Sequence, residues 1–356
     1  MLPLEKRAAI AVWELATSDS RYPSEQARRL SGREVQNSSD LPRNIMCPVN
    51  DTKFKYAMFI LTGISGQEDV HLWISIPFCI TYAMSIAGNS VILFIIKTDS
   101  SLHEPMYIFL SMLALTDLGL LIATMPTILG IYLLNSREIS INACIAQAYF
   151  LPALQCSESA VLLLMAFDRF IAISNPLRYA SILTVSRISR MALVCVLRSL
   201  LAILPFPLLL MQLQYSRDNV LSHSYCRNED IMKLTCSDTR INSVYGLSIQ
   251  ILTMGLDFLL IFLSYVMILK TVLSIASYAE CLKALNTCVS HLCAVLVFYS
   301  PDIILSILHR FATSSSPLVQ NLLSYASLLV PPLMNPIVYS VKSKELRVRI
   351  VRMFTK

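Results

Sequence analysis

Seven long apolar stretches, separated by short polar segments, dominate the chain after residue 70. Each is close to the roughly 20 apolar residues that a helix needs to cross a bilayer. Membrane β-barrels alternate apolar and polar positions strictly, and this chain does not; nor does any unit of about 20–50 residues repeat. The pattern therefore predicts an all-α membrane protein, a seven-transmembrane helix bundle, with spans at approximately Leu72–Ile96, Met106–Leu134, Ile141–Phe167, Met191–Met211, Tyr245–Leu269, Ala284–Leu308 and Leu318–Val341.

The first 45 residues differ from the rest, because they mix both charges with scattered Ser, Arg and Pro. Their one apolar patch, Ala8–Ala16, is interrupted by Glu14, whereas the apolar region of a signal peptide is continuous. We interpret residues 1–45 as a disordered extension, with Met46 as an alternative initiator. Residues 46–71 are then an extracellular N-terminus, residues 72–341 the bundle, and residues 342–356 a cytoplasmic amphipathic helix and tail.

Composition agrees with a membrane protein, since 55% of the 356 residues are hydrophobic and 15% are charged, against about 25% charged in soluble domains. Most of the net charge of +6 lies in the last fifteen residues, where six basic residues and one acidic residue give +5. Because the charge is local, it does not indicate a nucleic-acid partner. A basic tail with Leu346, Ile350, Val351 and Phe354 on one face predicts a helix lying on the membrane.

Charges between the spans predict the orientation of the bundle. The segment after the third span carries four arginines against Asp168, while the loop from Gln212 to Ser243 has no net charge. Because positive loops lie in the cytoplasm, seven crossings place the N-terminus outside. Asn37 and Asn50 begin glycosylation sequons on that outer side, although three-residue matches often arise by chance.

The ten cysteines fall into two groups. Those in or beside the spans are expected to act as small hydrophobic residues. Cys144, Cys226 and Cys236 are expected to face the oxidising exterior, where a Cys144–Cys226 disulfide would tie the outer loop over the mouth of the bundle. Cys47 is the remaining outer cysteine, and no Cys/His spacing indicates zinc.

Ionisable residues inside the spans are costly and are therefore functional candidates. Asp117 and Glu158 lie at mid-depth, where they can form a proton relay, a cation site or a protonated structural carboxyl. We expect Arg198 to extend toward the cytoplasmic face and Asp257 and His291 to face the interior, without assignable partners.

Asp168 and Arg169 end the third apolar stretch. Such a pair at a membrane edge is either an interfacial anchor or a latch that holds the bundle closed until it is released.

Six segments in order resemble the olfactory receptors, and within them the class I (fish-like) branch of these rhodopsin-like G-protein-coupled receptors. The resemblance covers the chain from Met46 onward. The segments are Gly88-Asn89, LHEPMYIFLSMLALTDLGL (Leu102–Leu120), MAFDRFIAISNPLRYASILT (Met165–Thr184), LSHSYC (Leu221–Cys226), KALNTCVSHLCAVLVFYSP (Lys283–Pro301) and PPLMNPIVYSVKSKELR (Pro331–Arg347).

The resemblance implies roles at the cytoplasmic end. Arg169, paired with Asp168, resembles the arginine that turns to the G protein when the sixth helix moves outward, and Phe170 replaces the usual tyrosine.

Asn335, Pro336 and Tyr339 resemble the seventh-helix switch, in which proline frees a carbonyl and lets the helix bend. For Asp117 and Glu158 the resemblance implies a sodium-type pocket near Asn335, with a protonated, hydrogen-bonding acid as the alternative.

The expected ligand site differs from the family pattern. Asp302, Ser306 and Arg310 follow the i, i+4, i+8 spacing of one helix face. Arg310 matches an arginine of several class I receptors and suits a carboxylate, unless it only faces lipid headgroups. Asp302 replaces an apolar residue and Glu229 an amide. We therefore expect a ligand that is cationic or donates hydrogen bonds rather than a simple fatty acid.

The outer loop also departs from the family, because Ser216 replaces a cysteine that relatives carry. We predict that Cys144–Cys226 forms and that Cys236 is free or pairs with Cys47.

Together these features predict an odorant receptor of the plasma membrane, multi-pass, without a cofactor and not an enzyme. Its predicted partners are a small-molecule odorant, a stimulatory olfactory-type G protein that raises cyclic AMP, and membrane lipid. Transporter repeats, a channel filter and the glycine-flanked motif of aspartyl intramembrane proteases are absent from the sequence. The alternative is a receptor fold that traffics poorly or is silent.

Overall fold

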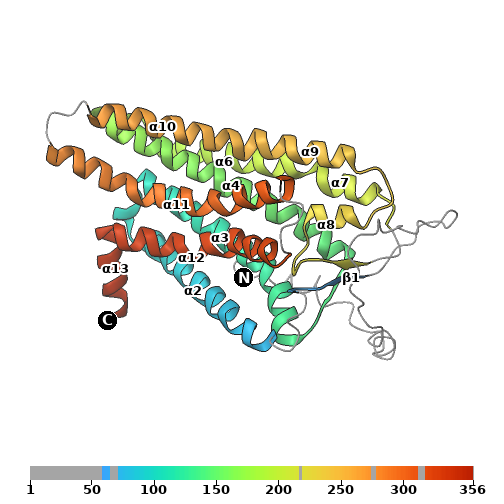
Figure 1. Cartoon of the computed structure of the whole chain (residues 1–356). Helices are drawn as coiled ribbons and strands as arrows, with labels where there is room; N and C mark the ends of the chain where they lie inside the picture. Colours follow the sequence, from blue (N-terminus) through green and yellow to red (C-terminus); the bar gives the residue numbers. More distant parts are fainter. Residues whose placement is uncertain (1–57, 65–70, 216–218, 274–277, 312–316, 356) are drawn as a thin grey trace.

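The computed structural model describes residues 58–64, 71–215, 219–273, 278–311 and 317–355. The predicted extension at residues 1–45 and both sequons, at Asn37 and Asn50, lie outside these residues. Within them, seven helices are long and apolar enough to cross a membrane. They gather in one bundle in Figure 1, where α2 crosses the others obliquely, so the predicted all-α seven-helix architecture is confirmed.

Five spans are single helices, and two are built from consecutive pieces. The single helices are α2 (His71–Thr98), α3 (Pro105–Leu134), α4 (Ile141–Ser174), α11 (Tyr278–Phe311) and α12 (Pro317–Lys342). The fourth span comprises α6 (Val185–Ile203) and α7 (Pro205–Gln212), and the fifth comprises α9 (Arg240–Gln250), a π-helix η5 (Ile251–Gly255) and α10 (Leu256–Leu273). Short elements complete the chain: η3 (Ser100–Leu102), η4 (Pro176–Arg178), α5 (Tyr179–Ile182), α8 (Asn228–Lys233) and α13 (Lys344–Phe354).

The ends of several helices are determined by individual residues rather than by where the apolar stretches stop. α3 ends at Asn135, whose φ of 52° is left-handed and stops the helix. α4 continues seven residues past the predicted end at Phe167, so Asp168 and Arg169 lie within its last two turns rather than after it. Pro205 begins α7, where its missing N–H separates the two halves of the fourth span.

α4 is the central helix, because it packs against α3, α6, α10 and α11. Its buried positions cover every side of the helix over Cys156–Leu162. Apolar residues of the outer helices instead face outward, as with Leu201 at 63% exposure and Phe262 at 58%. Such exposed apolar surface matches a lipid environment, in which tails rather than water cover the helices.

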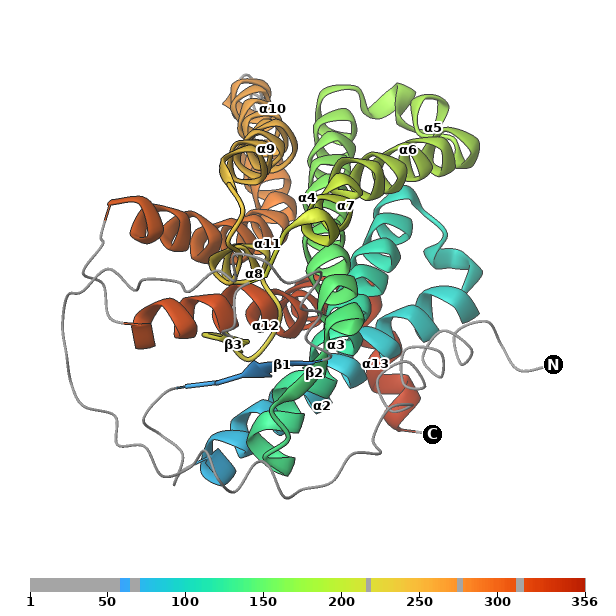
Figure 2. The same cartoon turned by 90° about the vertical axis from the view of Figure 1, so that its right-hand side faces the viewer.

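A small three-stranded sheet lies at the outer end, and hydropathy did not predict it. β1 (Met58–Leu61) is the central strand, antiparallel to β2 (Glu138–Ser140) and parallel to β3 (Val220–Leu221). Phe59 and Leu61 point inward from β1, with at most 2% exposure. Figure 2, which faces this end, shows the sheet beside α8 across the mouth of the bundle.

We call residues 213–215 and 219–239 the lid, because they lie between α7 and α9 in the chain and cover this end. The predicted Cys144–Cys226 disulfide is present and ties the lid to the start of α4. Cys236 is also disulfide-bonded, so the prediction of a free thiol there is wrong. Cys47, the alternative partner, lies outside the described residues.

α13 turns away from the bundle at the opposite, cytoplasmic end (Figure 1). Ser343 caps it, with its Oγ accepting a hydrogen bond from the Leu346 N–H at 3.3 Å. The predicted amphipathic helix is confirmed, but its apolar face is divided. Leu346 is buried against the bundle at 1% exposure, whereas Val351 is 54% exposed.

Candidate functional site

Asp168, Arg169 and Tyr179 form a polar cluster near the end of α4, which we call the latch after the role predicted for the Asp168–Arg169 pair. Arg169 Nε donates to Asp168 Oδ2 at 2.8 Å and its Nη2 contacts the same oxygen. Tyr179 Oη donates to Asp168 Oδ1 at 2.7 Å. Burial and the Asp168 charge raise the pKa of Tyr179, so its hydroxyl remains a donor. Tyr179 was not predicted from the sequence, although a tyrosine so soon after the Asp168–Arg169 pair could have indicated it.

The sixth span approaches the latch through His291 on α11. A carbonyl can only accept, so His291 Nε2 donates to Leu162 O at 2.9 Å, and Nδ1 of this neutral ring accepts from Tyr265 Oη at 2.6 Å. His291 therefore faces the interior, as predicted, and connects the third, fifth and sixth spans. Outward movement of α11 must break one of these two hydrogen bonds.

Pro336 shapes the seventh span through a carbonyl that it leaves without its helical partner. Proline lacks an N–H, so the Pro332 carbonyl, four residues earlier, accepts no helical bond from it. Asn89 Nδ2 donates to that carbonyl at 2.9 Å. A Cβ at Gly88 would lie 3.0 Å from the Pro336 ring, so glycine permits this close approach of α2 and α12.

Asp117, Glu158 and Asn335 meet in the middle of the bundle. Asn335 Nδ2 is 3.1 Å from Asp117 Oδ2 and 3.3 Å from Glu158 Oε1. The two carboxyl groups are also hydrogen-bonded to each other, and at most 1% of either residue is exposed. Two carboxyl groups in contact must share a proton or a cation, because two bare negative charges would repel strongly at this depth.

Arg198 does not extend toward the cytoplasm, and that prediction is wrong. Its guanidinium forms two hydrogen bonds to Asp257, at 2.8 and 2.5 Å. Asp257 is fully buried and also accepts from Ser159 Oγ at 2.9 Å, and Ser159 contacts Tyr299 Oη at 2.7 Å. The acid, unassigned in sequence, thus joins the third, fourth, fifth and sixth spans. The sequence did carry a signal for this pair, because Arg198 and Asp257 are opposite charges at similar depth in neighbouring spans.

The outer polar site centres on Asp302 of α11. Asp302 lies near Ser327, whose hydroxyl donates to Ser324 O at 3.1 Å, and within electrostatic reach of Arg227 in the lid. Ser306, one turn above, is half-buried. The side chain of Arg310 lies outside the described residues, so its expected role as the partner of a ligand carboxylate remains a prediction.

Arg227 was not predicted as a site residue, because only the net charge of the outer loop was considered. Its Nη1 donates to Ser324 Oγ of α12 at 2.8 Å. Its Nε lies 3.4 Å from Glu229, whose side chain is 59% exposed. Arg227, rather than Glu229, therefore faces the bundle, and Glu229 lies at its outer side.

The lid is held inward by buried polar contacts. The Cys226 N–H donates to Gln147 Oε1 of α4 at 2.7 Å. His223 contacts Asp230, which also accepts from Lys233 at 3.0 Å. Burial alone would raise the pKa of Asp230, but its contact with His223 and the charges of Lys233 and Arg227 outweigh burial and lower that pKa below its usual range.

These sites consist of hydrogen bonds and ion pairs between helices. Among the described residues, no group of three or more His, Cys, Asp or Glu side chains is placed to hold a metal ion. The outer polar site, the central acids and the cytoplasmic latch instead follow one another along the bundle. The arrangement suits a protein that transmits a conformational change across a membrane.

Comparison with known proteins agrees with this interpretation. The family described as "Olfactory receptor" matches residues 78–356. Human olfactory receptor 51A4 is 55% identical over 306 residues, covering 86% of this chain and 97% of the relative, and human olfactory receptor 51G2 is 55% identical over 305 residues, with the same coverage. Squid rhodopsin has the same fold, with a TM-score of 0.65, 17% identity, and coverage of 83% of this chain and 87% of that one.

Several predictions are therefore confirmed, including the receptor fold and a multi-pass location in the plasma membrane. The relatives are signalling receptors of the G-protein-coupled class that sense odorants, rather than enzymes. This chain belongs to the olfactory receptor family of rhodopsin-like G-protein-coupled receptors.

Proposed function

We propose that this receptor binds a small odorant that donates a hydrogen bond, in the outer half of the bundle, and activates a stimulatory olfactory-type G protein. The main support is the position of Asp302 on the sixth helix. That helix also carries His291, whose bonds to Tyr265 and Leu162 lie near the latch. A ligand that moves α11 from its outer end therefore acts on the helix that must open at its inner end.

The charges of the outer site support the ligand class. The charge of Arg227 acts on Asp302, so the protein already supplies a cation for this acid. A ligand ammonium is then not required, and a ligand carboxylate would meet the charges of Asp302 and Glu229. A hydroxyl can donate to Asp302 while its apolar remainder packs in the bundle. We therefore favour a neutral alcohol over both a fatty acid and an amine.

A cyclic AMP reporter assay in transfected cells tests the ligand class. Alcohols, amines and carboxylic acids of matched chain length are compared on the receptor and on Asp302→Asn, with cell-surface labelling of each variant. We expect the alcohol to be the best agonist and Asp302→Asn to weaken it about tenfold or more, because an acceptor loses its charge. Strong responses to short fatty acids that survive Asp302→Ala but vanish in Arg310→Ala would refute this ligand class.

The same assay tests G-protein coupling independently of the ligand. Arg169→Ala should reach the cell surface and bind ligand but raise no cyclic AMP, because the guanidinium released by Asp168 is the group offered to the G protein. Normal cyclic AMP from Arg169→Ala would contradict the latch. A receptor that is present at the surface and unresponsive to every ligand class would favour the alternative of a silent receptor, as would failure of both the Met1 and Met46 forms to reach the surface.

We also propose that Asp117 and Glu158 share either a proton or a sodium ion, and the close approach of their carboxyl groups supports this proposal. Carboxylate and amide oxygens of Asp117, Glu158 and Asn335 are the hard donors that suit such a cation. A cation bound there would stabilise the closed bundle by neutralising both acids. If sodium is bound, basal signalling should fall as sodium replaces potassium in membranes, and Asp117→Asn should abolish that dependence. If the pair shares a proton, exchanging the cations should have no effect.

A further inference from the structure

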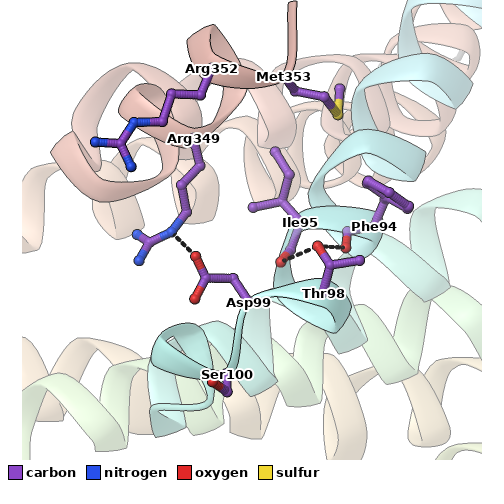
Figure 3. A pocket seen from close by; sticks show the side chains of 8 residues that line it. All are labelled: Phe94, Ile95, Thr98, Asp99, Ser100, Arg349, Arg352 and Met353. Atoms are coloured by element: carbon purple, nitrogen blue, oxygen red, sulfur yellow. Dashed lines mark hydrogen bonds and ion pairs between the residues drawn. The ribbon is translucent and has the colours of Figure 1, made fainter. Parts of the chain in front are cut away.

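A cavity of about 450 Å³ lies at the cytoplasmic boundary, between the end of α2 and α13. One side is formed by Phe94, Thr98 and Asp99, and the other by Arg349, Arg352 and Met353. Figure 3 shows the two arginines on α13 opposite the end of α2. No role described above uses this cavity, and none of its lining residues belongs to the ligand site or the latch.

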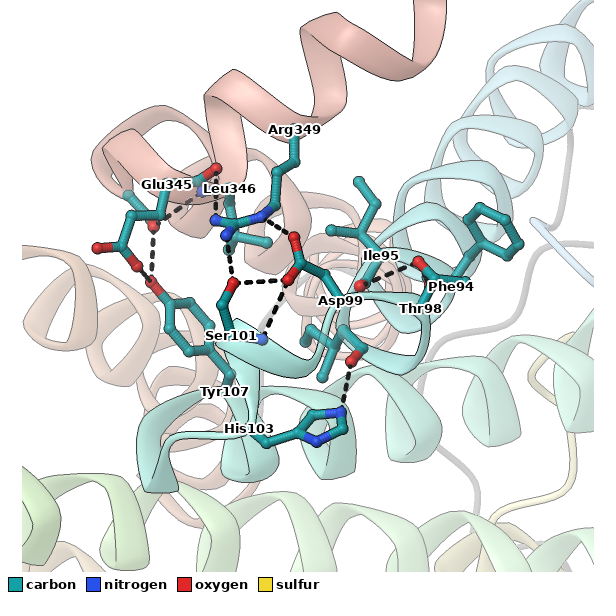
Figure 4. A network of polar contacts seen from close by, with 12 residues as sticks. Phe94, Ile95, Thr98, Asp99, Ser101, His103, Tyr107, Glu345, Leu346 and Arg349 are labelled. Carbon is teal, nitrogen blue, oxygen red and sulfur yellow. Dashed lines mark hydrogen bonds and ion pairs between the residues drawn. The ribbon is translucent and has the colours of Figure 1, made fainter. Parts of the chain in front are cut away.

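One arginine of the cavity is already neutralised. Arg349 forms an ion pair with Asp99 and also contacts Ser101 Oγ, while Ser101 donates its N–H to Asp99 at 3.0 Å and its hydroxyl at 2.6 Å (Figure 4). The hydrogen bonds from Ser101, followed by that from Arg349, lower the pKa of Asp99 to about 2. Asp99 therefore stays charged at physiological pH and balances Arg349. The network fixes α13 against the connection between α2 and α3.

Arg352 is the cation that this network leaves without a partner. Its side chain is exposed and lines the cavity, and within the part of the chain that the structure describes it forms no ion pair or hydrogen bond. The cavity therefore carries a net positive charge. Position near the end of α13 partly accounts for an arginine there, since cations favour helix C-termini, but it does not account for the cavity.

The other walls are apolar and lie at the level of the membrane surface. Phe94 is 57% exposed on α2, one turn before that span ends at Thr98. Met353 lies opposite it on α13, and Val351 of the same helix is 54% exposed. A basic group beside apolar surface at this depth matches a molecule with an anionic head and an acyl chain. Anionic lipids are concentrated in the cytoplasmic leaflet.

We propose that this cavity binds the phosphate headgroup of an anionic phospholipid. Arg352 pairs with the phosphate, and Phe94 and Met353 contact the upper part of an acyl chain. The Arg349–Asp99 ion pair fixes the spacing of the two walls and does not itself bind the lipid. Lipid seated there connects α13 to the first span, and so steadies the helix that borders the G-protein face.

Native mass spectrometry of the full-length receptor tests this site. The receptor is released from phosphatidylcholine nanodiscs containing a small fraction of phosphatidylserine or phosphatidylinositol 4-phosphate, and retained lipid is counted. Arg352→Gln is compared with Arg347→Gln, which removes the same charge from the same helix outside the cavity. We expect Arg352→Gln to lower anionic-lipid retention about fivefold, with Arg347→Gln and Arg352→Lys close to the unmodified receptor.

The outcomes distinguish this site from weaker explanations. Equal losses in Arg352→Gln and Arg347→Gln would mean general attraction to a charged surface and would overturn the proposal. Displacement of the lipid by millimolar inorganic phosphate would identify a free-phosphate site and would also overturn it. Retention that survives inorganic phosphate, and that falls only with Arg352→Gln, would support a lipid headgroup.

Discussion

The Arg198–Asp257 pair gives the sharpest test of how this bundle is held together. Both residues lie inside spans, and the guanidinium makes two hydrogen bonds to the carboxylate, at 2.8 and 2.5 Å. They differ in burial, since the Arg198 side chain is 32% exposed and that of Asp257 is fully buried. We therefore expect different costs when each partner is removed alone.

The magnitude follows from geometry and exposure. Two charges about 4 Å apart attract by about 4 kcal/mol at an effective dielectric constant of about 20. Removing one member of a buried pair costs about 3–5 kcal/mol, because the other is left uncompensated. Arg198→Met should reach about 3 kcal/mol, since Asp257 would keep only the Ser159 hydroxyl. Asp257→Leu should cost about 2 kcal/mol, because the partly exposed guanidinium can turn away.

The double variant Arg198→Met/Asp257→Leu carries the test. It leaves no uncompensated charge, so we expect it to be less destabilised than Arg198→Met alone, within about 1 kcal/mol of the unmodified receptor. Thermal unfolding of detergent-solubilised receptor, followed with a thiol-reactive dye, measures the four proteins. One kcal/mol corresponds to about 2 °C at this chain length. Surface labelling of cells checks that each variant is exported.

Additive behaviour would refute this reasoning. If the double variant loses the sum of the two single losses to within about 0.5 kcal/mol, the pair does not interact energetically. The isosteric single change Asp257→Asn serves as a control for packing. It should resemble Asp257→Leu in stability if charge is what matters.

Four further predictions concern other parts of the bundle. Gly88→Ala should lower stability by about 1–3 kcal/mol, because the new Cβ lies 3.0 Å from the Pro336 ring; unchanged unfolding would show that the first and seventh spans can separate freely. Cys144→Ser should lower the free energy of unfolding by about 4.5 kcal/mol, since the disulfide closes a sequence separation of 82 residues; normal surface expression of Cys144→Ser would argue against that cost. Tyr179→Phe should raise basal cyclic AMP several-fold by removing one of the bonds that hold Asp168, and unaltered basal signalling would show that Arg169 alone closes the latch. The lowered pKa of Asp230 means that its contribution to lid stability is complete above a pH of about 4 and is lost on stronger acidification; Asp230→Asn should reproduce that loss at neutral pH as increased proteolysis of the lid, and an equally resistant lid would contradict it.

Hydropathy was sufficient for the spans, because a bilayer imposes a length that a sequence must satisfy. The prediction for the seventh span, Leu318–Val341, coincides with the observed transmembrane segment. Helix ends were less predictable. The third span continues through Asp168 and Arg169 because their charges neutralise each other inside the helix, and a hydropathy window counts charges without pairing them.

Pairings between distant residues were the least predictable feature. Arg198 and Asp257 were assigned separately, since neither sequence position shows which faces of the fourth and fifth spans meet. Arg227 was concealed in a loop whose charges cancel, and the three strands were too short to produce a pattern. Cys236 was expected to be free or to pair with Cys47, because Ser216 replaces a cysteine that relatives carry, and it is disulfide-bonded. Each of these depends on contacts made by the folded chain.

The π-helix at Ile251–Gly255 has a consequence for how the fifth span can vary among receptors. Its wider turn shifts the phase of α9 relative to α10, so the two halves present faces that are set independently. Removing one residue from this segment would regularise the turn and rotate one half by about 100° against the other. Substitutions on α9 can therefore retune an outer surface while Asp257 and Tyr265 keep their inward register. A single inserted residue thus separates the part of the helix that can diversify from the part that must stay fixed.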